Sequence, residues 1–175
     1  MLNFKKSMLA MFVLVLMTLT ILSCSKDNDG PNNEGGSHLK AKIGAKEHTF
    51  NNASARWIDG GNYLEITGMT SNNEWLAITV MNDQNTRVPV GKYTLDDGTA
   101  FNILSIYHFM DNGAQKNFTA SRNTVWNDTF ELEISKINGT NVEGKFSGVL
   151  VIGSGLTTLE RITVENGTFN APFKN

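Results

Sequence analysis

Apolar and polar residues alternate one by one near position 130, and this period of two constrains the fold more than any other feature of the chain. Phe130, Leu132 and Ile134 fall on one face of an extended segment, and polar residues occupy the other face. Segments 63–69 and 75–81 show the same alternation. A strand with one buried and one solvated face is typical of antiparallel sheets.

Turn signals divide the C-terminal part of the chain into three strands. Asn138-Gly139 separates the run near 130 from Val142–Ile152, and Asn-Gly is a strong hairpin signal because both residues tolerate positive φ. Gly153-Ser154-Gly155 then precedes a third run, Leu159–Phe169. We therefore predict a C-terminal meander of three strands.

Regular short strands between turns are typical of a sandwich or a barrel. Asp59-Gly60-Gly61 and Asp97-Gly98 mark two further turns. Segment Phe101–Met110 is apolar at too many positions for its period to separate a strand from a buried helix, and we predict a strand. Gly144 and Gly148 share the apolar side of their strand, which predicts close packing or bulges. The fold predicted is an all-β, antiparallel β-sandwich, with a β-barrel as the alternative.

The N-terminal residues have the three parts of a secretory signal peptide. Lys5 and Lys6 precede the apolar run Met8–Leu22, and the small residue Ser23 ends the segment. The run of about 15 residues is shorter than the roughly 20 that a membrane-spanning helix requires. Residues 1–23 are therefore predicted to be a signal peptide.

Cys24 is the single cysteine of the chain, so it has no intramolecular disulfide partner. Ile21-Leu22-Ser23-Cys24 resembles the bacterial lipobox, in which the thiol receives a diacylglycerol and the chain is cut before the cysteine. Two or three acyl chains, such as palmitate, hold a protein firmly on a membrane. The resemblance implies a lipoprotein of the outer membrane, exposed on the cell surface, with a periplasm-facing orientation as the alternative.

The residues after Cys24 predict a tether. Lys26, Asp27 and Asp29 resemble the surface-export signal of Bacteroidetes lipoproteins. A calcium loop at the same place lacks the terminal Glu and the flanking helices of an EF-hand. Residues 25–37 contain no aliphatic or aromatic side chain and therefore favour a flexible segment. We predict the acylated Cys and tether at 24–37 and a single β domain at 38–175.

Four motifs of the body resemble a family of small, uncharacterised Bacteroidetes lipoproteins. They are Leu39-Lys40-Ala41-Lys42-Ile43 with His48-Thr49-Phe50, Gly91-Lys92-Tyr93-Thr94-Leu95, Val142-Glu143-Gly144-Lys145-Phe146-Ser147-Gly148, and Ile162-Thr163-Val164-Glu165-Asn166-Gly167-Thr168-Phe169. The resemblance implies a β fold and a lipid anchor, and it implies no catalytic residue.

Charge and motif searches point away from several function classes. The signal peptide holds two of the 15 basic residues and none of the 17 acidic ones, so the mature chain has 13 bases and a net charge of −4. Nucleic acid needs a basic patch and is not an expected partner. His38, His48 and His108 lack metal-motif spacing, and no Gly-x-Ser-x-Gly elbow occurs. We predict no metal, no cofactor and no catalytic residue.

Aromatic residues are the remaining candidates for binding. Trp75 and Tyr63 alternate with apolar neighbours and are the better candidates for exposure, and Trp57 and Trp126 are the others. Together they predict a platform on which sugar rings stack. The leading hypothesis is a non-enzymatic binding or structural module, with a glycan or an envelope protein as its partner. The alternatives are a carrier with an apolar barrel cavity and a glycan-active enzyme, for which Glu131 and Glu133 are the candidate carboxylates.

Overall fold

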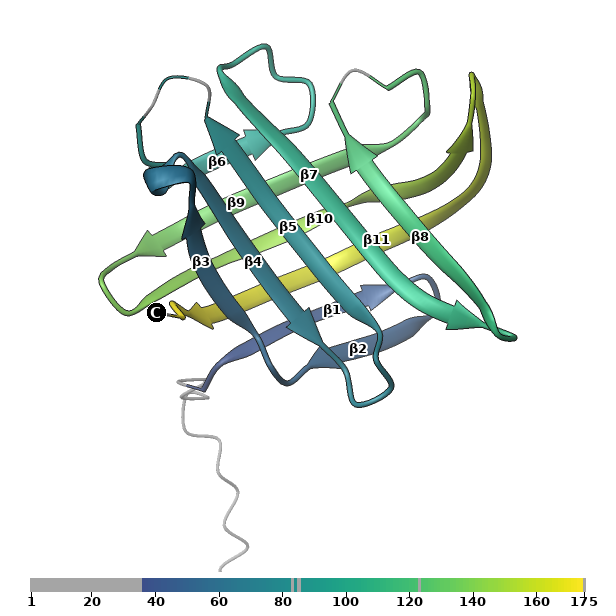
Figure 1. The fold of residues 1–175 in the computed structure, drawn as a ribbon, viewed down its shortest axis with the longest axis horizontal. Coiled ribbons are helices and arrows are strands. Elements are labelled where there is room, and N and C mark those ends of the chain that lie inside the picture. The colour runs from purple at the N-terminus through teal and green to yellow at the C-terminus, as the bar shows by residue number, and fades with distance from the viewer. Residues whose placement is uncertain (1–35, 83, 85, 123, 175) are drawn as a thin grey trace, which may run out of the picture. The chain divides into compact units, whose positions relative to one another are not determined.

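The computed structural model describes residues 36–82, 84, 86–122 and 124–174. These residues form eleven strands and one short 3-10 turn, η1 (Asp59–Gly61) (Figure 1). No helix among them is long and apolar enough to cross a membrane. The strands are β1 (His38–Ile43), β2 (Lys46–Phe50), β3 (Ser54–Ile58), β4 (Tyr63–Met69), β5 (Trp75–Asn82), β6 (Gly91–Thr94), β7 (Phe101–Asp111), β8 (Ala114–Ser121), β9 (Thr129–Ile137), β10 (Asn141–Ser154) and β11 (Thr157–Pro172).

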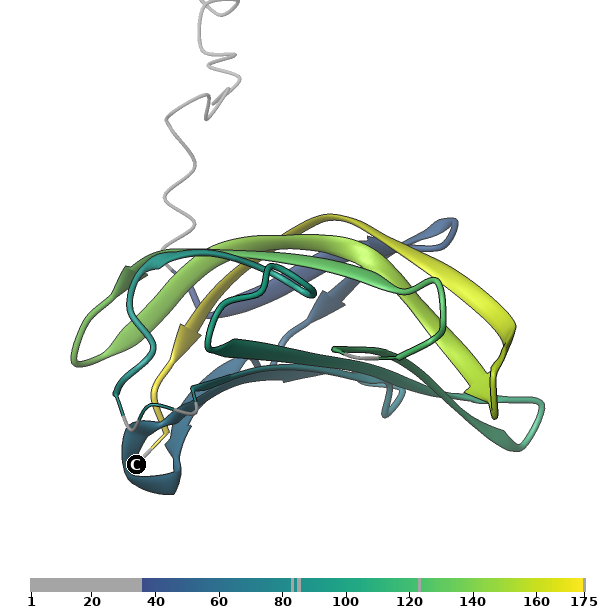
Figure 2. The ribbon, with the colours of Figure 1, turned by 90° about the horizontal axis from the view of Figure 1, so that it is seen from above.

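The strands form one antiparallel sheet that curls as a half-barrel, where we predicted a sandwich of two sheets. Its hydrogen-bonded order is β2-β1-β11-β10-β8-β7-β5-β4-β3, and β9 pairs with β10 and β6 off this path. Figure 2 shows the two facing layers and the long strands that bend from one towards the other. The all-β antiparallel prediction is confirmed, and the separation into two sheets is wrong because β10 and β11, with 14 and 16 residues, belong to both layers.

The C-terminal meander is confirmed, since β9 pairs with β10 and β10 with β11. The predicted bulges occur where the register shifts next to Gly144 and Gly148. A Cβ on Gly144 would meet the backbone oxygen of Glu133 and, at 2.5 Å, the ring of Phe169. Bulges bend a strand and increase its twist, so they let β10 follow the curl of the sheet.

The C-terminal end of β11 meets β3, the far edge of the sheet. Ala55 in β3 forms an isolated bridge with Phe173, and the Lys174 amide donates a hydrogen bond to the Ala55 carbonyl at 2.9 Å. The ring of Phe173 stacks on Trp57 with 5.7 Å between centroids. These contacts place the backbone of Lys174 alongside β3, on the side away from β4.

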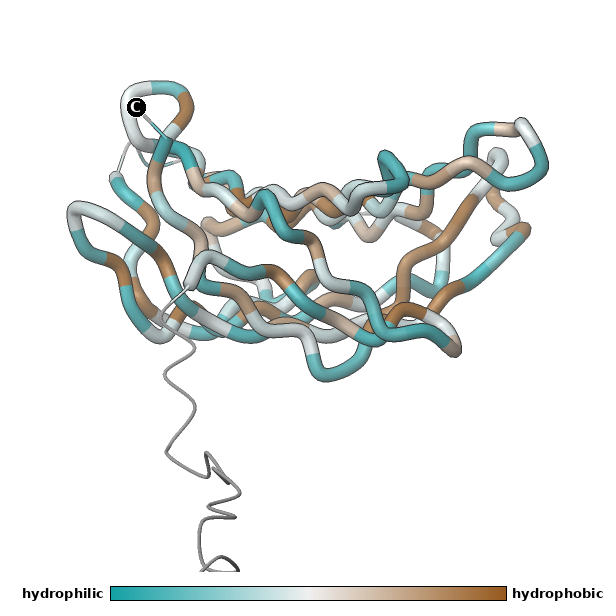
Figure 3. Tube along the Cα trace, turned by 90° about the horizontal axis from the view of Figure 1, so that it is seen from below, coloured by the Kyte–Doolittle hydropathy of each residue, from teal (hydrophilic) through white to brown (hydrophobic). Residues whose placement is uncertain are grey.

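The hydrophobic core lies between the two layers, and all its buried members fall between Leu39 and Ala171. In Figure 3 hydrophobic stretches run along both layers and most turns are hydrophilic. A body with its own core meets the usual definition of a domain. The largest fully buried side chains are Phe50, Phe130, Leu39, Leu64, Ile66, Leu76, Ile78, Ile103, Leu132, Ile134, Leu150 and Val80.

Tyr93 anchors β6 against the core. Its ring packs edge-on against Phe101 with 5.1 Å between centroids, and its hydroxyl donates to the Pro89 carbonyl. Burial raises the pKa of Tyr93 to about 12. Burial likewise raises the pKa of Tyr107, and the charge and hydrogen bond of Glu74 add to the effect. Both phenols therefore hold their protons at a pH where an exposed tyrosine, with a pKa of about 10, has begun to ionise.

Stability is expected to fall in alkali because of these tyrosines. The unfolded chain releases the phenol protons near pH 10, whereas folded Tyr93 holds its proton up to about pH 12. The contribution of Tyr93 is fully present below pH 10 and is lost as the pH rises through 12. Urea midpoints between pH 9 and 12 measure the loss, and Tyr93→Phe is expected to make it smaller. A midpoint that is flat over this range, or the same slope in the variant, would contradict the assignment.

Candidate functional site

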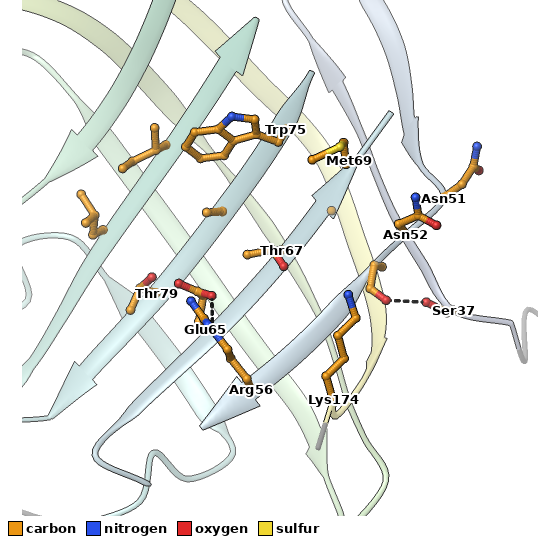
Figure 4. A pocket seen from close by; sticks show the side chains of 15 residues that line it. Ser37, Asn51, Asn52, Arg56, Glu65, Thr67, Met69, Trp75, Thr79 and Lys174 are labelled. Carbon is orange, nitrogen blue, oxygen red and sulfur yellow. Dashed lines mark hydrogen bonds and ion pairs between the residues drawn. The ribbon is translucent and has the colours of Figure 1, made fainter. Parts of the chain in front are cut away.

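A groove of about 880 Å³ lies on the outer face of β3, β4, β5 and β7 (Figure 4). Ligand sites of this size are common in proteins. Its walls come from the sheet, the β2–β3 loop and the C-terminal residues. The lining residues are Ser37, Asn51, Asn52, Ala53, Arg56, Glu65, Thr67, Gly68, Met69, Trp75, Ala77, Thr79, Leu104, Ile106 and Lys174.

Strand alternation explains why these side chains face outward. On β5, Leu76 and Ile78 are fully buried in the core, so Trp75 and Ala77 point to the other face. The same period applies to β4 and β7, whose registers with β5 set Thr67 and Ile106 on either side of Ala77. The predicted outward position of Trp75 agrees with this arrangement.

The floor of the groove is more apolar than the solvated face of an ordinary antiparallel sheet. Ala77 pairs with Ile106, and Thr79 pairs with Leu104, so aliphatic side chains of β7 lie beside β5. The sequence carried a signal for this floor, because segment 101–110 is apolar at positions on both faces. The same mixed apolar faces, in segments 75–81 and 101–110, are also the basis for the alternative of a carrier with an apolar cavity.

Trp75 forms the aromatic wall, and its neighbours hold its ring. The indole stacks on the His108 imidazole with 5.3 Å between centroids and 18° between planes. His108 is fixed in turn, because its Nδ1 lies 2.8 Å from Oδ1 of Asn117 on β8. Trp75 is half-buried and still lines the groove. A held aromatic ring loses little conformational entropy when a flat ligand face packs on it.

An ion pair crosses the groove between β3 and β4. Arg56 Nε donates to Glu65 Oε1 at 2.6 Å, and the two residues are directly opposite in the strand register. The Glu65 hydrogen bond and charge raise the pKa of Arg56 further above its usual value. The Arg56 guanidinium is therefore charged at neutral pH, and the Glu65 side chain lies against it as its ion-pair partner.

Lys174, Asn51 and Asn52 lie at the polar end of the groove (Figure 4). All three are exposed. Within the ranges that the structure describes, their side chains make no hydrogen bond or ion pair. Ser37 is different, because its hydroxyl donates to the Ala53 carbonyl at 2.8 Å. This end of the groove thus offers one ammonium and two amide groups to a ligand.

Tyr63 and Trp57 do not join Trp75. Tyr63 lies on the same outer face, opposite Met81, but it is not one of the residues that line the groove. Trp57 is opposite Leu64 in the register and packs between Phe173 and the Arg87 guanidinium, which lies 5.3 Å from the indole centroid. It contributes to a separate hollow of about 400 Å³ near the β9–β10 turn.

Trp126 packs on a different strand and covers Gly153 of β10. A Cβ at Gly153 would overlap the indole ring, and Trp126 Nε1 donates to the Gly155 carbonyl at 3.2 Å. The structure therefore brings only Trp75 of the four aromatic candidates into the groove. The packing of Trp126 depends on Gly153, which is distant in the sequence. Alternation of apolar and polar residues does not indicate such a contact.

Glu131 and Glu133 lie outside the groove, on the face of β9 that is turned away from the core. Glu133 Oε2 is 3.8 Å from Lys92 Nζ, and both residues line a hollow of about 700 Å³ rich in charged side chains. His48 pairs with Glu74 at 3.0 Å. In the described part of the chain, no group of three or more His, Cys, Asp or Glu residues is placed to hold a metal ion.

Cys24, Lys26, Asp27 and Asp29 lie outside the described residues. Comparison of the chain with protein-family models, with curated proteins and with solved structures finds no match. The interpretation of the groove therefore depends on its own residues.

Proposed function

We propose that this chain is a lipid-anchored glycan-binding protein of the bacterial outer membrane. Cys24 carries the acyl chains, residues 25–37 form the tether, and the body faces the cell surface or, alternatively, the periplasm. The lipobox-like segment and the resemblance to small Bacteroidetes lipoproteins support the anchor. The groove on the outer face of the sheet supports the binding role.

The observation that carries the proposal is the position of Trp75 in the groove. Sugar rings have one face of C–H groups, and that face packs on an aromatic ring while the hydroxyls at the ring edge form hydrogen bonds. Trp75 provides the ring, and the aliphatic floor of Leu104 and Ile106 extends the apolar surface. Aromatic side chains that are half-buried and held by packing are typical anchors of binding sites.

The polar groups of the groove suit an oligosaccharide. Asn51, Asn52, Thr67 and Thr79 offer amide and hydroxyl groups that both donate and accept hydrogen bonds. Asn51 and Asn52 lie at one edge of the groove, and Thr67 and Thr79 lie on β4 and β5 within it (Figure 4). A site with one apolar face and a polar edge matches the two-sided chemistry of a sugar ring.

The carboxylates favour binding over hydrolysis. Most glycosidases use two carboxylates that flank the scissile bond. Glu65 is the one carboxylate among the lining residues, and its Oε1 is 2.6 Å from Arg56 Nε. A single carboxylate that is held in an ion pair can keep the Arg56 side chain in place, but it does not form the pair of carboxylates that hydrolysis uses.

Trp75→Ala is expected to weaken glycan binding at least tenfold, because the variant removes the stacking surface and keeps the sheet. The test uses the body, residues 36–175, which contains the whole core. Acrylamide quenching of tryptophan fluorescence, with and without a panel of polysaccharides, identifies a glycan that protects an indole. Isothermal titration then compares the wild-type body with Trp75→Ala.

Trp126→Phe is the control, because the Trp126 ring packs on Gly153 of β10, outside the groove. This variant should leave glycan affinity unchanged. Circular dichroism confirms that each variant is folded. If no glycan protects an indole, or if Trp75→Ala binds as tightly as the wild type, glycan binding in this groove is refuted.

A further inference from the structure

We infer that the groove selects acidic oligosaccharides, with a carboxylate bound at Lys174 and a neighbouring sugar ring stacked on Trp75. The inference rests on the proposed glycan binding and adds the chemical class of the ligand. It follows from the charges of the groove, from the distance between its two ends and from the way the backbone holds Lys174.

The charges of the groove leave one cation for a ligand. Arg56 and Glu65 neutralise one another at 2.6 Å. Lys174 is the other charged lining residue, and it has no ion-pair partner within the described ranges. The described side chains that line the groove therefore carry a net positive charge, although the whole chain has a net charge of −2. A positive site on an acidic protein is complementary to an anionic ligand.

The amide groups next to Lys174 suit a carboxylate. Asn51 and Asn52 lie at the same end of the groove, and their side-chain NH₂ groups are donors. An ammonium that donates to a carboxylate forms a charge-assisted hydrogen bond, which is shorter and stronger than a neutral one. The amide of Asn52, which lines the same side of the groove, adds a neutral donor for the carboxylate or for a sugar hydroxyl.

The spacing of the groove requires more than one sugar unit. Trp75 lies on β5, and the Lys174 amide is bonded to Ala55 on β3. Two strand spacings separate β5 from β3, about 10 Å. This backbone spacing exceeds the width of one sugar ring, and we therefore expect the stacked ring and the carboxylate to belong to different units of an oligosaccharide.

The fold fixes the position of the Lys174 backbone through contacts with β3. Its amide donates to the Ala55 carbonyl at 2.9 Å, and the preceding residue, Phe173, stacks on Trp57. The backbone is thus held on both sides of the peptide bond that leads into Lys174. The side chain extends from this fixed point along the groove (Figure 4).

The test measures binding of matched charged and neutral oligosaccharides to the full chain in phospholipid nanodiscs. The probes are oligogalacturonate, hyaluronan oligosaccharides and alginate oligosaccharides, each beside the same compound after reduction of its carboxyl groups. Isothermal titration is expected to show at least one acidic probe that binds tenfold or more tightly than its reduced form. Lys174→Gln should remove this preference, and added salt should decrease it.

Lys145→Gln is the matched control, because it removes the same charge from the outer face of β10, away from the groove. It should keep the preference for the acidic probe. Trp75→Ala should weaken binding of both the acidic and the reduced form. This pattern would assign the charge preference to Lys174 and the stacking to Trp75.

The two proposals fail in different ways. Equal affinity for acidic and reduced probes, binding of neutral glycans alone, or an unchanged preference in Lys174→Gln would refute the acidic ligand and leave glycan binding in place. If neither these probes nor a panel of neutral polysaccharides binds the wild-type chain, the proposed function itself is refuted, and the inference falls with it.

Discussion

Replacing Cys24 with serine is expected to abolish incorporation of labelled palmitate into the protein in cells. A hydroxyl at this position cannot form the thioether that carries the diacylglycerol. Each buried CH₂ group of an acyl chain contributes about 0.8 kcal/mol to membrane binding, so loss of two or three chains removes nearly all of the anchoring energy. Palmitate labelling followed by mass measurement of the N-terminal peptide checks the outcome.

Labelling decides this prediction better than cell fractionation does. An unprocessed Cys24→Ser precursor keeps the apolar run Met8–Leu22, which can hold it on a membrane without any lipid. Ser25→Ala is the matched control and should remain labelled. Labelling of Cys24→Ser to the wild-type level, or an unlabelled wild-type protein, would contradict the lipoprotein assignment.

Gly144→Ala is expected to destabilise the body by about 3 kcal/mol, at the upper end of the usual cost of overpacking. A Cβ at this position would come closer than 3.0 Å to the backbone oxygen of Glu133 and to the ring of Phe169. The backbone oxygen belongs to the β9–β10 ladder and cannot move without breaking the pairing. No change of side-chain rotamer can therefore relieve the contact between the added Cβ and the Glu133 backbone oxygen.

Gly139→Ala makes the same chemical change in the turn that joins these two strands. Nothing lies within 4 Å of the added Cβ, so the free energy of unfolding should change by less than about 0.5 kcal/mol. Urea denaturation of both variants measures the difference. Equal stability of the two variants would show that β10 can shift at the bulge, contrary to the packing described above.

The strands themselves follow from local patterns. The predicted segments 63–69 and 75–81 agree with β4 and β5, and the ambiguous segment 101–110 is β7. Each of these strands has a buried face that the period of two identifies. Gly144 and Gly148 indicated bulges because they occupy positions on the apolar side of the strand but have no side chain to pack in the core.

The way the strands join could not be read from the same patterns. Pairing of Leu39 with Phe169 and of Val151 with Thr119 connects residues far apart in the chain. Alternation shows which face of a strand is buried and does not show which strand lies next to it. The prediction of two sheets failed for this reason, since long strands that cross between layers have the same period as short ones.

The sequence predicted one residue of the candidate site, Trp75, but not the residues around it. Alternation placed Trp75 outside the core, next to apolar neighbours on the same strand. The polar end depends on Lys174, which lies beside β3 because Phe173 forms a bridge with Ala55 and the Lys174 amide donates to the Ala55 carbonyl. No local pattern indicates such a contact between the end of the chain and an edge strand.

The pairing of β1 with a strand on each side affects how the body responds to mechanical force. β1 lies between β2 and β11 and pairs with both along its length, from Leu39 to Ile43. The proposed tether joins the chain at the start of β1. A pull along the strand therefore loads two hydrogen-bond ladders in shear, and many bonds share the force at once. Traction on the proposed glycan ligand should therefore stretch the proposed tether before it unfolds the β domain.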